Sequence, residues 1–191
     1  MRFEPLAIQG AARLHLDRHA DERGWFARVF CEREFAQHGH ASSLAQASLS
    51  FNARAGTVRG LHFQWPPSQE SKLVRCVRGE LLDVLLDLRP PSPSYLQHLA
   101  LPLDADERQA LYVPVGVAHG FQTLADATEV LYMMSDYYAP QLQAGVRWND
   151  PAFGISWPMA QIIQNDRDRD LPLFDRSGFE RELQRRRAAP A

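Results

Sequence analysis

The 191-residue chain contains little cysteine, and the spacing of Cys31 and Cys76 fits neither a disulfide framework nor a zinc site. No apolar run approaches the roughly 20 residues that span a bilayer, and the N-terminus lacks an apolar stretch of signal-peptide length. Neither sign of charge dominates, because 21 Lys and Arg residues face 23 Asp and Glu residues. These absences argue against a secreted disulfide scaffold, a membrane protein and a nucleic-acid-binding protein. We therefore expect a cytoplasmic protein with reduced thiols.

The composition that remains is that of a globular protein, with 45% hydrophobic and 23% charged residues. The length suits one domain with a sizeable core. We expect this domain over residues 1–175 and a helical tail over residues 176–191. Three successive arginines in the tail indicate a solvent-exposed helix rather than a nucleic-acid patch, because the rest of the chain is balanced in charge.

Short apolar runs in the middle of the chain predict strands. The candidates are residues 73–77, 81–88, 111–113, 119–124 and 129–134. Gly79 lies between the first two, which predicts a hairpin there. Helices are expected only outside this block, at 30–38 and 179–187. Many short strands with turn-sized gaps indicate an antiparallel barrel or sandwich.

The segment 59–64 resembles part of the metal-binding pattern of cupin barrels, but it is incomplete. That pattern has two histidines one residue apart and a third after a proline-glycine turn. Here His62 and His119 are present, while Gln64 occupies the second position, and glutamine is a poor transition-metal ligand. We therefore expect no metal. Strand alternation predicts His62 and Gln64 on one inner face and His119 on another.

Cationic side chains cluster in the same region, with Arg59, His62 and Lys72 inside fourteen residues. Unpaired cations are rarely buried for packing alone, so the cluster indicates an anionic ligand or an intermediate that develops negative charge. Arg23 could add a phosphate contact, although a solvent-exposed loop arginine fits its spacing equally well. Tyr132 could turn its phenol inward or serve as amphipathic core. By composition alone, residues 165–170 form a charged surface loop.

These residues and their order resemble the dTDP-4-dehydrorhamnose 3,5-epimerase family over about residues 3–173. The matching motifs lie at 21–26, 56–64, 72–80, 83–89, 112–121, 131–132, 136–140, 145–151 and 154–158. The resemblance implies an all-β fold, a cupin-type jelly-roll barrel with short flanking helices. It also implies a homodimer that needs no cofactor. The substrate would be a nucleotide-diphosphate-linked 4-keto-6-deoxy sugar, inverted at C3, C5 or both.

The resemblance also assigns roles. His62 would be the general base, oriented by Asp168, and Tyr132 the general acid on the opposite face of the sugar. Deprotonation next to a ketone requires a base and a stabiliser of the enolate together, and Lys72 fits the second role. Arg23 and Arg59 would bind the diphosphate, and His119 would line the sugar pocket.

Several positions that the family associates with nucleotide contacts differ from its commonest pattern. These are Arg28, residues 46–48 (with Gln46 and Ser48), Gln143 and Arg167. The other expected substrate-binding residues are Phe26, Gln64 and Tyr138. Thymidine is the expected base, with cytidine and guanosine as alternatives. Two other functions stay open: a metal-dependent cupin enzyme, and a catalytically silent paralogue that binds a nucleotide sugar.

Overall fold

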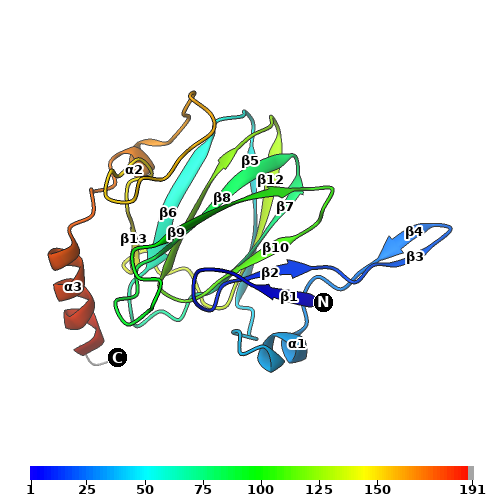
Figure 1. Ribbon diagram of the computed structural model, residues 1–191, viewed down its shortest axis with the longest axis horizontal. Coiled ribbons are helices and arrows are strands. Elements are labelled where there is room, and N and C mark those ends of the chain that lie inside the picture. Colours follow the sequence, from blue (N-terminus) through cyan, green and yellow to red (C-terminus); the bar gives the residue numbers. More distant parts are fainter. Residues whose placement is uncertain (189–191) are drawn as a thin grey trace.

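Two antiparallel sheets face each other and enclose the core (Figure 1). The computed structural model describes residues 1–188. The six-stranded sheet runs in the order β1 (Arg2–Pro5), β2 (Ala12–His15), β10 (Ala110–Val113), β7 (Lys72–Arg78), β12 (Thr128–Met134) and β5 (Gln46–Asn52). The five-stranded sheet runs in the order β13 (Gln143–Gly145), β6 (Val58–Gln64), β11 (Val117–Thr123), β8 (Glu80–Asp87) and β9 (His98–Asp104). The predicted all-β jelly-roll barrel is confirmed.

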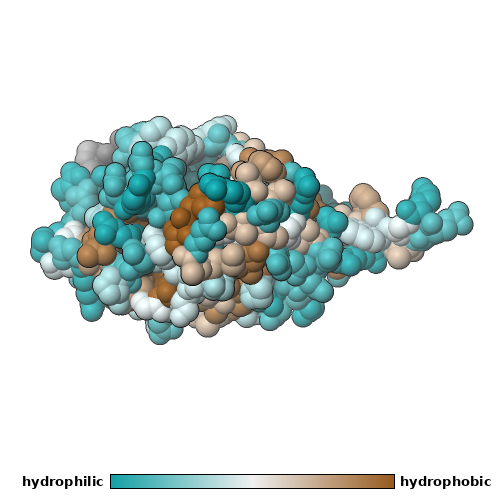
Figure 2. Space-filling view, turned by 90° about the horizontal axis from the view of Figure 1, so that it is seen from above, coloured by the Kyte–Doolittle hydropathy of each residue, from teal (hydrophilic) through white to brown (hydrophobic). Residues whose placement is uncertain are grey.

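A separate hairpin, β3 (His19–Asp21) and β4 (Gly24–Phe26), projects away from the barrel (Figure 1). Figure 2 shows it as a narrow extension from the body of the molecule. Three short helices flank the sheets: α1 (Glu32–Gln37), α2 (Asp166–Arg169) and α3 (Arg176–Ala188). The helices predicted at 30–38 and 179–187 are confirmed, while α2 was expected to be a loop. The last residues of the expected tail, 189–191, lie outside the described residues. None of the described helices is long and apolar enough to cross a membrane.

All five predicted strands exist, but the predicted hairpin at Gly79 is wrong. β7 pairs with β10 and β12, whereas β8 pairs with β11 and β9, so the chain crosses from one sheet to the other at this glycine. Both strands carry apolar side chains toward the core, among them Val74 on β7 and Leu85 on β8. Two such faces are buried together when the strands lie in opposing sheets rather than side by side.

Strand alternation places functional side chains on the core face of the sheets. On β8, Asp83 lies between Leu81 and Leu85, and all three are fully buried. His119 on β11 and Tyr132 on β12 follow the same alternation and face the core from opposite sheets. A polar group on a core-facing position needs a partner or a ligand. The alternation therefore marks where a site can be built.

The outer faces of the two sheets are covered unequally. On the five-stranded sheet, Phe179 of α3 packs against Phe63 and Trp65, with ring centroids 5.9 and 4.8 Å apart. On the six-stranded sheet, the edge strand β5 leaves Leu49 61% and Phe51 55% exposed. An exposed apolar edge of this kind is typical of a surface that another chain covers.

Candidate functional site

A cavity of about 300 Å³ opens between the two sheets beside α2. It is lined by Ser50, Arg59, His62, Lys72, His119, Gly120, Phe121, Tyr132, Asn165, Arg167 and Asp168. All four predicted catalytic residues are in this set, together with three of the predicted substrate-binding residues. They come from β6, β7, β11, β12 and α2, which extend from residue 58 to residue 169, so the fold brings them together.

His62 and Asp168 form a hydrogen-bonded dyad at one wall of the cavity. His62 Nε2 lies 2.8 Å from Asp168 Oδ1, and the Asp168 side chain is almost completely buried. The backbone N–H of Gly60 donates to the other carboxylate oxygen at 3.1 Å. Burial alone would raise the pKa of Asp168, but the hydrogen bonds from His62 and Gly60 and the nearby charge of Arg59 hold it below its usual range. The carboxylate is therefore kept ionised beside the imidazole.

The short helix α2 fixes the carboxylate. Asn165 caps it by accepting a hydrogen bond from the backbone N–H of Asp168 at 2.8 Å. The expectation of a plain charged loop at 165–170 is wrong, because Asp168 turns inward and only its neighbours stay in solvent. Composition cannot reveal which member of a charge run is buried.

A β-bulge in β6 turns Arg59 and His62 toward the same cavity. His119 pairs with His62, and Phe121 pairs with Arg59. Arg59 and His62 therefore have one more residue between them on β6 than their partners have on β11. Gly60, at the bulge, has φ of +106°, and a Cβ there would lie 2.6 Å from the carbonyl oxygen of His119. Only glycine fits this approach. The bulge thus interrupts the regular alternation of side chains along β6, and Arg59 and His62 face the same side.

The sequence-based placement of His119 is a second correction. His62 and His119 are cross-strand partners in one sheet, not residues of different faces. His119 Nε2 lies 2.9 Å from Asp83 Oδ2, and both side chains are almost inaccessible to solvent. The wall opposite Tyr132 therefore holds two histidine–carboxylate pairs.

Tyr132 faces this wall from β12 of the other sheet. Its ring meets that of His119 edge-on, with centroids 6.0 Å apart. Burial, and next the negative charge of Asp83, raise the pKa of the Tyr132 phenol far above its usual range. A phenol held in this way keeps its proton at neutral pH and can donate it only to a strongly basic carbon.

Lys72 is not the unpaired cation that the sequence suggested. Its Nζ lies 2.5 Å from Glu70 Oε1, and both side chains are largely buried. Gln64 Nε2 donates to the other oxygen of Glu70 at 2.9 Å. Sequence reasoning missed Glu70 because it lies in the loop before β7, where no strand alternation predicts its direction.

Arg59 and Arg167 supply further positive charge to the cavity. Arg59 Nε donates to Asn52 Oδ1 at 2.7 Å, a neutral partner that positions the guanidinium without cancelling its charge. Within residues 1–188, no carboxylate lies within ion-pair distance of Arg59 or Arg167. Both guanidiniums are available to an anionic ligand.

Three predicted substrate-binding residues lie on or just after the projecting hairpin and do not line the cavity of their own chain. The Arg23 side chain is 85% exposed and pairs with Asp21 at 2.6 Å. Phe26 is 75% exposed. Arg28 pairs with Glu34 at 3.1 Å.

Five others surround the loop after β12. Gln46 Oε1 accepts from the backbone N–H of Tyr138 at 2.6 Å, and the Tyr138 hydroxyl is hydrogen-bonded to Gln143. Ser48 pairs with Tyr132 across β5 and β12 but is exposed to solvent. Gln64 accepts from the backbone N–H of Ala139 at 3.0 Å. Gln46, Gln64, Tyr138 and Gln143 are hydrogen-bonded within or to this loop, and none of the five side chains lines the cavity.

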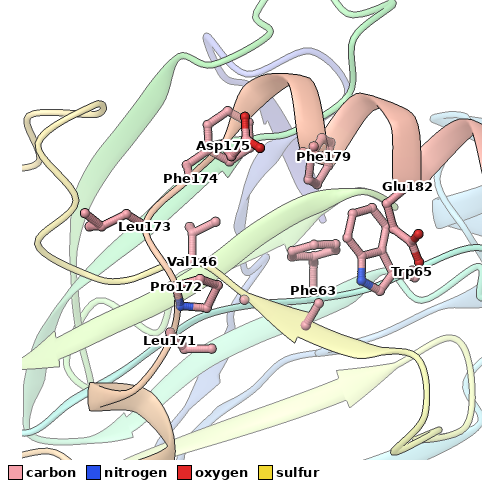
Figure 3. Close-up of a pocket in the computed structure, with 13 residues that line it drawn as sticks. Phe63, Trp65, Val146, Leu171, Pro172, Leu173, Phe174, Asp175, Phe179 and Glu182 are labelled. Atoms are coloured by element: carbon pink, nitrogen blue, oxygen red, sulfur yellow. The ribbon is translucent and has the colours of Figure 1, made fainter.

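No group of three or more His, Cys, Asp and Glu side chains in residues 1–188 is arranged to hold a metal ion. A larger cavity, of about 390 Å³, lies between α3 and the outer face of β6 and β13 (Figure 3). Its walls are mostly apolar, including Val146, Leu171 and Phe174, and its acidic groups are Asp175 and Glu182. It is lined by no His, Lys or Tyr side chain, whereas all four predicted catalytic residues line the cavity between the sheets.

The comparisons with known proteins agree on one group. A family model for dTDP-4-dehydrorhamnose 3,5-epimerase matches residues 5–176. The chain is 39% identical over 173 residues to the dTDP-4-dehydrorhamnose 3,5-epimerase of Sinorhizobium fredii, covering 90% of this chain and 89% of the relative. It is also 39% identical to the dTDP-4-dehydrorhamnose 3-epimerase of Streptomyces niveus, covering 91% and 84%.

Solved structures give the same result. The dTDP-4-dehydrorhamnose 3,5-epimerase of Bacillus anthracis, with TDP and PPi bound, has a TM-score of 0.86 and 37% identity, covering 91% of this chain and 99% of that one. The Legionella pneumophila dTDP-6-deoxy-D-glucose-3,5-epimerase, in complex with dTDP-4-keto-L-rhamnose, has a TM-score of 0.86 and 28% identity, covering 95% and 96%.

Proposed function

The chain belongs to the dTDP-4-dehydrorhamnose 3,5-epimerase family and is an epimerase of that family, and from this premise we propose its substrate and the roles of its residues. The substrate is dTDP-4-dehydro-6-deoxy-D-glucose, and the product is dTDP-4-dehydro-L-rhamnose. The observation that supports this is the arrangement of the cavity: His62 of one sheet, hydrogen-bonded to Asp168 of α2, lies across from the Tyr132 phenol of the other sheet.

His62 removes the proton next to the C4 ketone. A base must be neutral before it acts and positive afterwards, and the ionised Asp168 at 2.8 Å favours the imidazolium that forms. The electron pair moves from the C–H bond onto the carbonyl oxygen. Lys72, on the wall of the same cavity, stabilises that enolate oxygen.

Tyr132 then returns a proton to the opposite face of the same carbon. Reprotonation from the side of His62 would regenerate the substrate, so inversion requires a donor on the other wall. The enolate carbon takes the phenol proton as the C=O bond reforms. Asp83 and the surrounding core keep that proton on Tyr132 until a strong base is present.

The diphosphate binds to Arg59 and Arg167 at the mouth of the cavity, and a second subunit supplies Arg23. The apolar edge around Leu49 and Phe51 is the surface that the second subunit covers. The hairpin projects away from its own barrel (Figures 1 and 2), so it can reach a neighbour. We therefore assign Arg23, Phe26 and Arg28 to the partner's site and propose a homodimer.

The loop after β12 contributes to the nucleotide pocket through Tyr138, with Gln46, Ser48 and Gln143 around it. We assign residues 1–175 to the epimerase domain and the chain from residue 176 onward to a tail, of which α3 (Arg176–Ala188) is the described part. The two free thiols, Cys31 and Cys76, are consistent with a cytoplasmic location.

The experiment is incubation with dTDP-, CDP- and GDP-linked 4-keto-6-deoxy sugars in heavy water, followed by NMR at C3 and C5. We expect deuterium and inversion at both carbons with the dTDP sugar. Activity should survive a chelator, because the Gln64 amide is hydrogen-bonded to Glu70 and Ala139 and is not free to bind a metal. Activity lost with EDTA and restored by one divalent ion would favour a metal-dependent cupin enzyme. Absence of exchange with every sugar would favour a silent binding protein.

Inversion at C3 alone is a second candidate. The Streptomyces niveus 3-epimerase matches this chain at 39% identity, as the Sinorhizobium fredii 3,5-epimerase does. The same deuterium experiment separates the two, because a 3-epimerase leaves the C5 configuration of the substrate unchanged.

A further inference from the structure

Glu70 is the second member of a hydrogen-bonded chain that begins at Lys72 and leads out of the cavity through Gln64. The Glu70 carboxylate accepts from Lys72 Nζ at 2.5 Å through one oxygen and from Gln64 Nε2 at 2.9 Å through the other. Gln64 Oε1 in turn accepts from the backbone N–H of Ala139 at 3.0 Å. The side chains of Lys72 and Glu70 are only 13% and 9% exposed. Lys72, at the cavity wall, is thus connected through Glu70 and Gln64 to the loop after β12.

Lys72 is the only lysine in the chain, since the other members of the 21 Lys and Arg residues are all arginines. An ammonium is a compact charge on a flexible four-carbon stem, and it has no preferred direction of its own. Stabilising an enolate requires a donor that is in place before the charge develops. A separate group must therefore hold this ammonium in place.

We propose that Glu70 is the positioning residue for Lys72, and that Gln64 couples this pair to the loop at Tyr137–Ala139. The inference rests on the role of Lys72 in the proposed function. Glu70 does not touch the reacting atoms. It fixes the ammonium where the ketone oxygen binds, and Gln64 gives the carboxylate its second hydrogen bond.

The donor and acceptor pattern explains why a carboxylate is needed at this position. Gln64 must accept from Ala139, so its Nε2 donates toward residue 70. Residue 70 must therefore accept from both Gln64 and Lys72, and an ionised carboxylate is an acceptor at both oxygens. A glutamine at position 70 would turn one amide N–H toward a donor, whichever way the two amides are oriented. The substitution Glu70→Gln changes few atoms and breaks the chain at one link.

The pattern also predicts its own repair. In the double variant Gln64→Glu/Glu70→Gln, the new carboxylate accepts from Ala139 and from the new amide, whose oxygen accepts from Lys72. Every donor in this hydrogen-bonded chain again faces an acceptor. The negative charge moves from residue 70 to residue 64, farther from the Lys72 ammonium. Rescue by this exchange would show that the chain orients Lys72.

The experiment compares Glu70→Gln, the exchanged double variant and Lys72→Ala, with Glu180→Gln as control. Glu180 lies in the exposed ion pair with Arg176 at 3.0 Å, so the control makes the same chemical change away from the cavity. We expect Glu70→Gln to lower kcat by roughly ten- to a hundredfold with little change in KM. Deuterium exchange and inversion should fall together, because the enolate itself is affected. The double variant should recover most of the loss.

A measurement that needs no substrate tests the same point. Protein labelled with 15N-lysine gives a single side-chain signal, because Lys72 is the only lysine in the sequence. We expect its ammonium protons to exchange slowly with water in the wild type and the double variant, and quickly in Glu70→Gln. Failure of wild-type turnover would contradict the proposed function and leave this test intact. Slow exchange and wild-type kcat in Glu70→Gln would overturn the positioning role.

A double-mutant cycle separates positioning from general stability. Lys72→Ala leaves Glu70 as an uncompensated buried charge, which destabilises the fold. Adding Glu70→Gln should raise the melting temperature again while kcat stays at the Lys72→Ala level. A further fall in kcat would mean that Glu70 acts on catalysis independently of Lys72, and the proposal would be wrong.

Discussion

His62 Nε2 and Asp168 Oδ1 lie 2.8 Å apart although 106 residues separate them in the sequence. One residue comes from a bulged strand of the barrel and the other from a four-residue helix after the last strand. The helix therefore brings a buried carboxylate within hydrogen-bond distance of the imidazole. The two side chains meet because α2 packs against β6.

Replacing the base should stop both steps of the reaction. His62→Ala should lower deuterium exchange and inversion alike, by on the order of a thousandfold. Binding of the nucleotide should weaken only slightly, because Arg59 and Arg167 remain. NMR of the sugar in heavy water and calorimetry with dTDP measure the two effects. Exchange at the wild-type rate in this variant would mean that another residue is the base.

Removing the charge of Asp168 should lower both activity and stability. In Asp168→Asn, the amide can accept from His62 or from Gly60 but not from both, because its nitrogen is a donor. We expect the free energy of unfolding at pH 7 to fall by roughly 2 kcal/mol. Asp166→Asn is the matched control, since the Asp166 side chain on the same helix is 90% exposed.

The difference in stability between the wild type and Asp168→Asn should depend on pH, because the pKa of Asp168 is lowered in the folded protein. The folded carboxyl has a lower pKa than the unfolded one, which is about 3.9. Its stabilisation is therefore fully present above that value and is lost as pH falls through the folded pKa. Denaturant titrations should show the wild type and Asp168→Asn converging in strong acid. A gap that stays constant from pH 7 to pH 2 would show that the charge is irrelevant.

Sequence alone predicted most of the barrel and part of its site, and the failures have specific causes. Tyr132 obeys strand alternation, so its inward direction could be read from the pattern. The bulge at Gly60 breaks that alternation, which hid the shared direction of Arg59 and His62. The burial of Asp168 depends on a helix docking against β6, a long-range contact that no local pattern predicts.

The dimer can be tested through its apolar edge. Leu49→Asp places a charge on a surface that the second subunit should cover, so light scattering should give a mass near the 21.7 kDa of one chain. Leu173→Asp is the matched control, because Leu173 is 52% exposed and lies on the other side of the barrel, beside α3. The control should remain a dimer. A monomeric wild type at micromolar concentration would contradict the prediction.

Exchange of the hairpin between subunits predicts complementation. Arg23→Ala and His62→Ala homodimers should both be impaired. In a mixed dimer, one cavity combines an intact His62 with an intact Arg23 from the partner, so about half of the wild-type activity per mixed dimer should return. Tagged co-expression and purification of the mixed species measures this. Activity that does not rise in the mixed dimer would place Arg23 in the site of its own chain.

The last prediction separates the acid from the base. Tyr132→Phe removes the phenol and keeps the ring, so the contact with His119 and the core packing should change little. His62 can still form the enolate, and a proton or deuteron can return from the same side. Deuterium wash-in should therefore continue while inversion slows by on the order of a hundredfold or more. In His62→Ala, by contrast, both should fall together. Equal loss of exchange and inversion in Tyr132→Phe, with nucleotide affinity and melting temperature unchanged, would mean that the phenol also serves enolate formation.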